Sequence, residues 1–161
     1  MGNPVEEPTM SEYDELLLDA YRGEVLGAAL FGAMADAAPD DRQREQLRAL
    51  QRVEARTAAR LRDLVDAAGL DAGTDGPTTD GRQMAEGTRD EDWSAFLAAL
   101  RRALPPFFAK FERLRAIGVP DDPVLADLVA HERAIDRFAE LELEGRHADA
   151  LDVLEGHLAD A

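Results

Sequence analysis

The stretch LDAGTDGPTTDGRQMAEGTR, residues 70–89, interrupts the helical pattern that fills most of this 161-residue chain. It is rich in Gly, Thr and Asp and lacks apolar residues at helical spacing, so we expect a long, mobile crossover. On both sides of it, apolar residues recur three and four positions apart, and no segment alternates with a period of two. This pattern predicts an all-α fold. One long connection between two pairs of helices favours a four-helix bundle with a crossover over an up-down bundle with three short loops.

Two long helices are expected before the crossover. The first begins at the N-cap Ser11 and reaches about Ala37, because Pro39 stops it. The second begins at Asp40 or Asp41, whose carboxylate suits a helix N-terminus, and ends just before a C′ glycine at position 69. The short connection between them predicts an antiparallel hairpin.

Two more long helices and a short one are expected after the crossover. One runs from about position 90 to position 118 and contains Pro105-Pro106, where we expect a kink or a break. The next opens with Asp122-Pro123, an N-cap followed by proline at N1, and reaches Gly145. A short fifth helix covers 147–159. The domain prediction is therefore a disordered segment at 1–10 and a single helical bundle at 11–161.

The composition excludes several classes of function. There is no cysteine, which removes disulfides, thiolate metal sites and thiol nucleophiles. The 34 acidic residues against 18 basic ones give a formal net charge of −16, which argues against binding to nucleic acids or anionic membranes. No stretch is long and apolar enough to span a membrane, and the first ten residues lack the features of a secretory signal. A cytoplasmic protein is expected.

Each long helix carries one glutamate on or beside its apolar stripe. Glu24, Glu54 and Glu132 lie at the centres of their stripes, and Glu112 lies at the edge of an aromatic run. Counted from the two turns, Glu24 lies at the height of Glu54, and Glu112 at the height of Glu132. Four carboxylates gathered in a core need cations between them, and these are either metal ions or arginines.

Four short motifs contain these glutamates: YRGE at 21–24, VEART at 53–57, FERL at 111–114 and HERA at 131–134. With the bundle pattern, they resemble the ferritin-like superfamily of rubrerythrins and ferritins, whose di-iron sites use a glutamate from each of two helices and Glu-x-x-His from the other two. The resemblance implies a carboxylate-rich di-metal site of iron or manganese and an oxidoreductase or oxygen-activating activity. The ligands that it implies are Glu24, Glu54, Glu112, Glu132 and His131.

The sequence departs from the family pattern at the expected histidines. Thr57 and Ile135 stand three residues after Glu54 and Glu132, where the motif has histidine. His131 is the one imidazole near the site, about 100° around the helix from its neighbour Glu132, so both reach one cavity only if the site straddles them. Asp136 is a weaker candidate ligand, and Tyr21 is a candidate partner for a ligand carboxylate.

Other interpretations stay open. A metal-free bundle would be a structural or interaction module, expected to be a homodimer, with arginines neutralising the core glutamates. Arg22, Arg56 and Arg60 are the candidate partners, and Glu112 is simply solvated in that case. His147 and His157 are expected at the surface. A third hypothesis is a binding protein for an apolar ligand, with the Pro105-Pro106 break opening a cavity between the helices.

Overall fold

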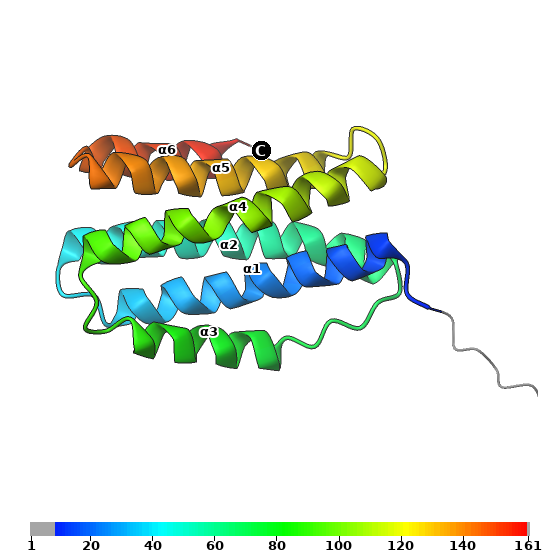
Figure 1. The fold of residues 1–161 in the computed structure, drawn as a ribbon, viewed down its shortest axis with the longest axis horizontal. Coiled ribbons are helices and arrows are strands. Elements are labelled where there is room, and N and C mark those ends of the chain that lie inside the picture. The colour runs from blue at the N-terminus through cyan, green and yellow to red at the C-terminus, as the bar shows by residue number, and fades with distance from the viewer. Residues whose placement is uncertain (1–8, 161) are drawn as a thin grey trace, which may run out of the picture.

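The computed structural model describes residues 9–160, which form helices and no strand (Figure 1). The all-α prediction is therefore confirmed for this part of the chain. The six helices are α1 (Glu12–Asp36), α2 (Asp41–Ala67), α3 (Asp75–Gly87), α4 (Trp93–Ile117), α5 (Pro123–Leu143) and α6 (His147–Ala159). Of the segment 1–10 that we expect to be disordered, residues 1–8 lie outside the described residues, and Thr9 and Met10 are exposed and outside any helix.

Side-chain caps explain where the long helices begin, and those at Ser11, Asp40 and Asp122 were predicted. The Ser11 hydroxyl accepts a hydrogen bond from the backbone N–H of Asp14 at 3.1 Å, and Asp40 accepts one from Gln43 at 2.8 Å. Asp92 and Asp122 cap α4 and α5 in the same way. Each side chain satisfies a backbone donor that has no partner inside the helix.

Glycines at positive φ end α2 and α5. Gly69 has a φ of 69° and Gly145 has a φ of 77°. At the first of these, the N–H groups of Gly69 and Leu70 donate to the carbonyls of Asp66 and Val65, which is the Schellman arrangement. Both stops follow from the sequence, because a residue without Cβ adopts this left-handed conformation at little cost.

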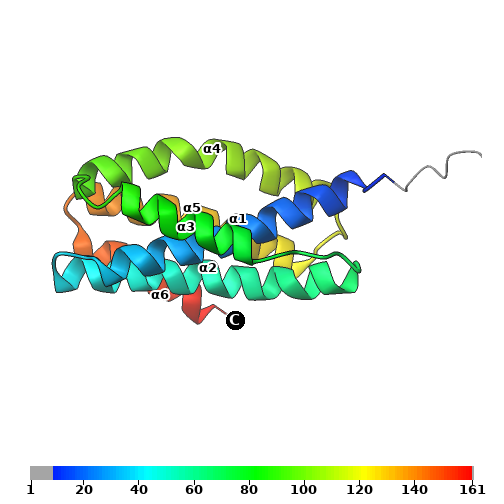
Figure 2. The same ribbon diagram turned by 90° about the horizontal axis from the view of Figure 1, so that it is seen from below.

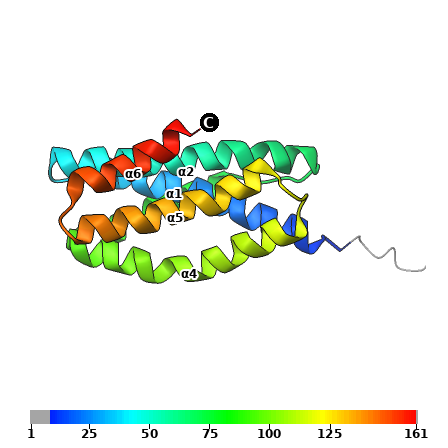
Figure 3. The same cartoon turned by 90° about the horizontal axis from the view of Figure 1, so that it is seen from above.

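The long helices form two pairs. Helix α1 packs along α2, and α4 packs along α5 (Figure 1). The short α6 turns back and lies beside both α2 and α5 (Figure 3). Helices α1, α2, α4 and α5 all contact a neighbour in the other pair, so they form one bundle. None of the helices in residues 9–160 has the length and apolar character that crossing a membrane requires.

The crossover differs from the prediction because it contains α3. This helix packs against the outside of α1 (Figure 2). Its buried residues are Gly81 and Ala85, one turn apart, so the contact uses small side chains. A Cβ built on Gly81 would lie 2.4 Å from the carbonyl oxygen of Leu26. Helical propensity predicts a loop here, and the close contact with α1 overrides it.

Helix α4 is unbroken at Pro105-Pro106, so the expected break is absent. The two prolines lack N–H groups, which leaves the carbonyls of Arg101 and Arg102 without their usual helical donors. Figure 2 shows α4 as an arch, the form that a helix takes when such bonds are missing on one side. The prolines therefore bend the helix instead of ending it.

Candidate metal centre

A polar layer divides the core of the bundle. One apolar cluster includes Leu17, Leu61 and Leu125, and the other includes Phe31, Leu50 and Phe138. Between them, α1, α2 and α5 place buried polar side chains at the same height. These are Glu24 from α1, Glu54 from α2, and His131 and Glu132 from α5.

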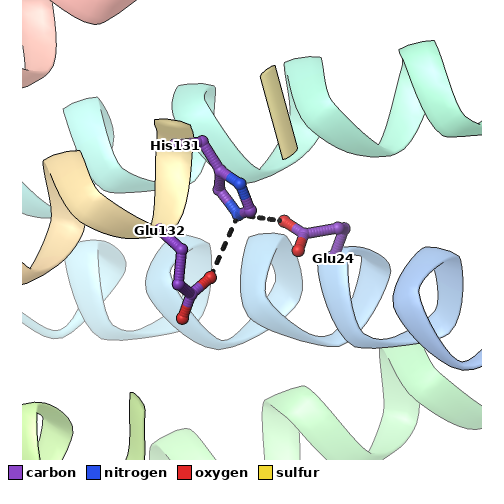
Figure 4. A group of neighbouring side chains, drawn as sticks. All are labelled: Glu24, His131 and Glu132. Atoms are coloured by element: carbon purple, nitrogen blue, oxygen red, sulfur yellow. Dashed lines mark ion pairs between the residues drawn. The ribbon is translucent and has the colours of Figure 1, made fainter. Parts of the chain in front are cut away.

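The ionisable members of this layer are almost fully buried. The exposed fractions are 3% for Glu24, 8% for Glu54, 5% for Glu132 and 0% for His131. The sequence prediction that the three central glutamates face the core is confirmed. His131 and Glu132 are adjacent in the chain, and the site does straddle them, since both point into the same space between the helices (Figure 4).

The His131 ring holds the layer together. Its Nδ1 lies at the backbone carbonyl of Leu128, which can only accept, so Nδ1 must donate. A neutral His131 therefore has its lone pair on Nε2. That atom lies 2.9 Å from Oε2 of Glu24, 3.3 Å from Oε2 of Glu132 and 3.8 Å from Oε2 of Glu54 (Figure 4 shows the first two).

Two of these atoms have no hydrogen-bond partner in the described part of the chain. Oε2 of Glu24 and Nε2 of His131 are both buried, and their close approach does not have hydrogen-bond geometry. One donor atom each from Glu24, His131 and Glu132 lie within 4.8 Å of one another. Buried polar atoms are normally paired, so this arrangement is suited to a cation or a proton shared between the groups.

Burial and mutual repulsion shift the pKa values of the layer. Burial, followed by repulsion from Glu24, raises the pKa of Glu54 well above its ordinary value. Burial raises the pKa of Glu132 to about 7, although His131 opposes this shift. Burial alone would lower the pKa of His131, but the carboxylates of Glu24 and Glu54 outweigh it and raise that pKa well above 6.5. The layer therefore retains protons when no other cation is present.

A glycine makes room for the Glu54 carboxylate. A Cβ on Gly27 would lie 2.8 Å from Cδ of Glu54 and 3.0 Å from its Oε1. Gly27 lies in the middle of α1, three residues after Glu24, where glycine costs helix stability. The missing side chain allows the carboxylates of Glu24 and Glu54 to share one space.

The other sequence candidates lie outside the layer. Glu112 is exposed on α4, with 48% of its side chain accessible, and pairs with Arg133 at 3.3 Å, so its placement among the ligands is wrong. Glu112 lies at the edge of the apolar stripe of its helix, and in the structure this edge faces solvent. Asp136 pairs with Arg101 at 2.9 Å. The Tyr21 hydroxyl accepts a hydrogen bond from Arg62 at 3.3 Å and does not support a carboxylate of the layer.

Arginines do not neutralise the three glutamates of the polar layer in the described part of the chain. Within residues 9–160, no ion pair joins an arginine to Glu24, Glu54 or Glu132. Arg56 and Arg60 instead pair with Asp127 at 3.5 and 3.0 Å. The arginine pairing predicted for a metal-free bundle is therefore wrong for these three glutamates, because Arg56 and Arg60 pair with Asp127 instead.

The sequence analysis missed a fourth buried glutamate, Glu142. It accepts from Arg42, Gln46 and His147 at 2.7 Å each and from Trp93 at 3.1 Å. Burial would raise its pKa, but the hydrogen bonds from His147, Trp93 and Gln46 lower it. Continuing the α5 stripe by one turn would have found it, because Glu142 follows Phe138 and Ala139 at helical spacing.

The two histidines of α6 also differ in part from the prediction. His147 is exposed, as expected, although it bonds to Glu142. His157 is not at the surface: only 10% of its side chain is exposed, and its Nε2 lies 3.7 Å from Oδ1 of Asp127. The packing of α6 against α2 and α5 covers it, which the sequence pattern of a short terminal helix did not indicate.

No protein-family model, curated protein or solved structure matches this chain.

Proposed function

We propose that the chain binds a divalent transition-metal ion between Glu24, His131 and Glu132, with Glu54 as a fourth donor. The observation that supports this most directly is the orientation of the His131 ring. Its Nδ1 is held by the Leu128 carbonyl, so a neutral ring directs the Nε2 lone pair toward three carboxylates. A histidine fixed through its second nitrogen is the usual form of an imidazole metal ligand.

The donor set indicates the kind of metal. Three carboxylates and one imidazole form an oxygen-rich site, which suits manganese or iron and does not exclude zinc. A single ion needs only these four side chains. A second ion would have to share the same carboxylates, because Glu112 is exposed and no second imidazole joins the layer among the described residues. We therefore propose one strong metal site. The second metal of a di-metal centre would bind beside it and share its carboxylates.

The ferritin-like resemblance is consistent with this proposal and extends it. Two helix pairs joined by a long crossover, with glutamates meeting in the core, have the arrangement that the resemblance implies. A redox-active iron or manganese ion in a buried site would supply oxidation chemistry, and the protein would hold the ion and exclude water from it. We propose that the protein is an oxidoreductase of this kind. The resemblance assigns no substrate to it.

The direct test is metal analysis of protein purified without chelators, followed by titration of the metal-free protein with Mn²⁺. We expect about one ion per chain, and we expect Glu132→Gln to weaken Mn²⁺ binding by at least about tenfold. The matched control is Glu112→Gln, which removes an exposed glutamate of the next helix and leaves Mn²⁺ binding unchanged. A folded wild-type protein that contains no metal and does not bind Mn²⁺ would contradict the proposal.

The alternative function is a metal-free bundle that acts as an interaction module, expected to be a homodimer. One observation favours it. His131 lies 2.9 Å from Glu24, and its raised pKa would allow an imidazolium to neutralise part of the layer. If this alternative is correct, Glu132→Gln changes the stability of the protein and leaves its affinity for Mn²⁺ unchanged. The metal proposal instead expects that affinity to fall.

A further inference from the structure

A cavity lies beside the polar layer, between α1 and α4. It has a volume of about 180 Å³. Glu24, Glu54 and Glu132 form its polar floor. The remaining walls are almost entirely apolar, with Gly23 and Gly27 on α1 facing Leu100, Leu104 and Phe107 on α4.

The two facing helices explain why the cavity exists. Helix α4 is arched (Figure 2) and contains Pro105-Pro106, and all of its buried residues are apolar. Opposite it, α1 presents glycines instead of side chains, and a Cβ on Gly23 would meet nothing within 4 Å. The sequence hypothesis placed a cavity at the prolines, and this cavity is lined by their neighbours Leu104 and Phe107 in an unbroken helix.

The cavity has an apolar mouth. Met84 of α3 and Phe107 of α4 line it, and they are among the few large apolar side chains that remain exposed, at 51% and 41%. Asp19 of α1 also lines the cavity and pairs with Lys110 of α4 at 2.8 Å, which joins the two helices beside the opening. Exposed apolar side chains around a concave site are typical of an entry for an apolar ligand.

We propose that this cavity is the substrate pocket of the metal centre and that it admits a neutral apolar molecule of about the size of a single ring. The inference rests on the proposed metal site, because the carboxylate floor is where the ion would meet the substrate. The size follows from the volume, since an apolar cavity of about 150 Å³ accommodates benzene. The neutral character follows from the lining. The carboxylate floor would repel an anion, a cation would compete with the metal ion for that floor, and the apolar walls offer no partner to either.

The experiment uses benzene as the probe and Mn²⁺ as a paramagnetic reporter. Benzene is titrated into the metal-free protein, and its binding is followed by the shift in thermal unfolding temperature. It is then added to the Mn²⁺-loaded protein after free metal is removed, and the proton relaxation of benzene is measured. We expect saturable binding in both forms and strongly enhanced relaxation in the second, because the pocket adjoins the site.

Two alanines of α4 provide matched variants. Both are exposed, but Ala103 lines the cavity and Ala109 does not. Ala103→Phe should fill the pocket and abolish both benzene binding and the relaxation effect while Mn²⁺ remains bound. Ala109→Phe should retain benzene binding, the relaxation effect and Mn²⁺ binding.

The outcomes separate this inference from the proposed function. If Mn²⁺ binds but benzene shows no enhanced relaxation, or if Ala103→Phe leaves the relaxation unchanged, the pocket proposal is overturned and the metal site stands. If the wild-type protein binds no Mn²⁺, the metal function fails, and the pocket loses its role as a substrate site. Benzene binding to the metal-free protein then shows whether the cavity takes an apolar ligand.

Discussion

Two buried glutamates of this protein have opposite surroundings. Glu142 accepts hydrogen bonds from four side chains, so its charge is compensated inside the bundle. Within residues 9–160, Oε2 of Glu24 has no hydrogen-bond partner. The carboxylates of Glu54 and Glu132 approach the same His131 ring. Leaving a buried charge unpaired costs several kcal/mol, so evolution normally replaces it unless a cation binds there. The contrast identifies Glu142 as a structural residue and Glu24 as a candidate ligand.

The close approach of Gly27 to Glu54 gives a test of the site that changes no ligand. In Gly27→Ala, the new methyl group would displace the Glu54 carboxylate, whose Cδ lies 2.8 Å from the Cβ position. We expect Mn²⁺ affinity to fall by about tenfold, as it does when the support of a ligand is disturbed. Calorimetric titration measures this change.

The control for Gly27→Ala is Gly23→Ala, one turn earlier on α1. Nothing lies within 4 Å of a Cβ at this position. Alanine should therefore stabilise the helix by up to about 1 kcal/mol and leave Mn²⁺ affinity unchanged. Equal affinities for both variants would show that Glu54 does not contribute to metal binding.

At the scale of the elements, α3 and α4 give this bundle its particular form. Helix α3 lies in the crossover and carries Met84 to the mouth of the cavity. The arch of α4 leaves the space that a straight helix would fill (Figure 2). Neither feature is needed for a four-helix core, so both are candidates for functional adaptation.

Docking of α3 on α1 depends on Gly81. A Cβ at this position would lie 2.4 Å from the Leu26 carbonyl oxygen and 3.0 Å from the backbone nitrogen of Leu30, and backbone atoms cannot move aside cheaply. We expect Gly81→Ala to detach α3, which limited proteolysis would show as faster cleavage within residues 70–92. Gly76→Ala, in the same helix but with open space around its Cβ, should not accelerate cleavage. Unchanged proteolysis of Gly81→Ala would mean that α3 does not depend on this contact.

At the scale of the whole molecule, charge acts in two ways. The net charge of −16 is spread over the surface, where ion pairs contribute little and self-repulsion opposes compaction. The polar layer adds buried carboxylates whose protonation is tied to folding. Both effects make the metal-free protein less stable as protons are removed.

The pH dependence of stability follows from the raised pKa of Glu132. Its value of about 7 in the folded protein exceeds the ordinary 4.5, so the folded state holds a proton that the unfolded chain releases. This contribution is complete below pH 4.5 and is lost as the pH rises through 7, with an upper limit of about 3 kcal/mol. Glu54 and His131 have the same sign, because their pKa values are also raised.

Urea unfolding of the chelator-treated protein between about pH 5.5 and pH 8.5 measures this loss. The lowered pKa of His157 makes the free energy of unfolding rise with pH over part of this range. Because both proteins contain His157, comparing the wild type with Glu132→Gln isolates the contribution of Glu132. We expect the free energy of unfolding to fall more steeply with pH in the wild type than in this variant. Parallel curves would show that Glu132 is ionised in the folded protein throughout.

Local chemistry made most of the helices predictable. Ser11, Asp40 and Asp122 act as N-caps and Gly69 and Gly145 as stops in both the sequence and the structure. The short terminal helix has the predicted bounds, His147–Ala159. The centres of the apolar stripes also identified Glu24, Glu54 and Glu132 as core residues. N-caps, C-terminal glycines and apolar stripes depend on residues a few positions apart, so the sequence alone predicts them.

Some features of this protein follow from its sequence alone, and others depend on its tertiary structure. The sequence determined an all-α chain, its caps and three inward-facing glutamates, because those depend on helical spacing and local hydrogen bonds. It did not determine that α3 forms in the crossover, that Glu112 faces solvent, or that His131 replaces arginine as the partner of the buried carboxylates. Each of these depends on which residues distant in the chain approach one another. Only the packing of α1, α2 and α5 brings three carboxylates to one imidazole, and only the arch of α4 leaves a cavity beside them.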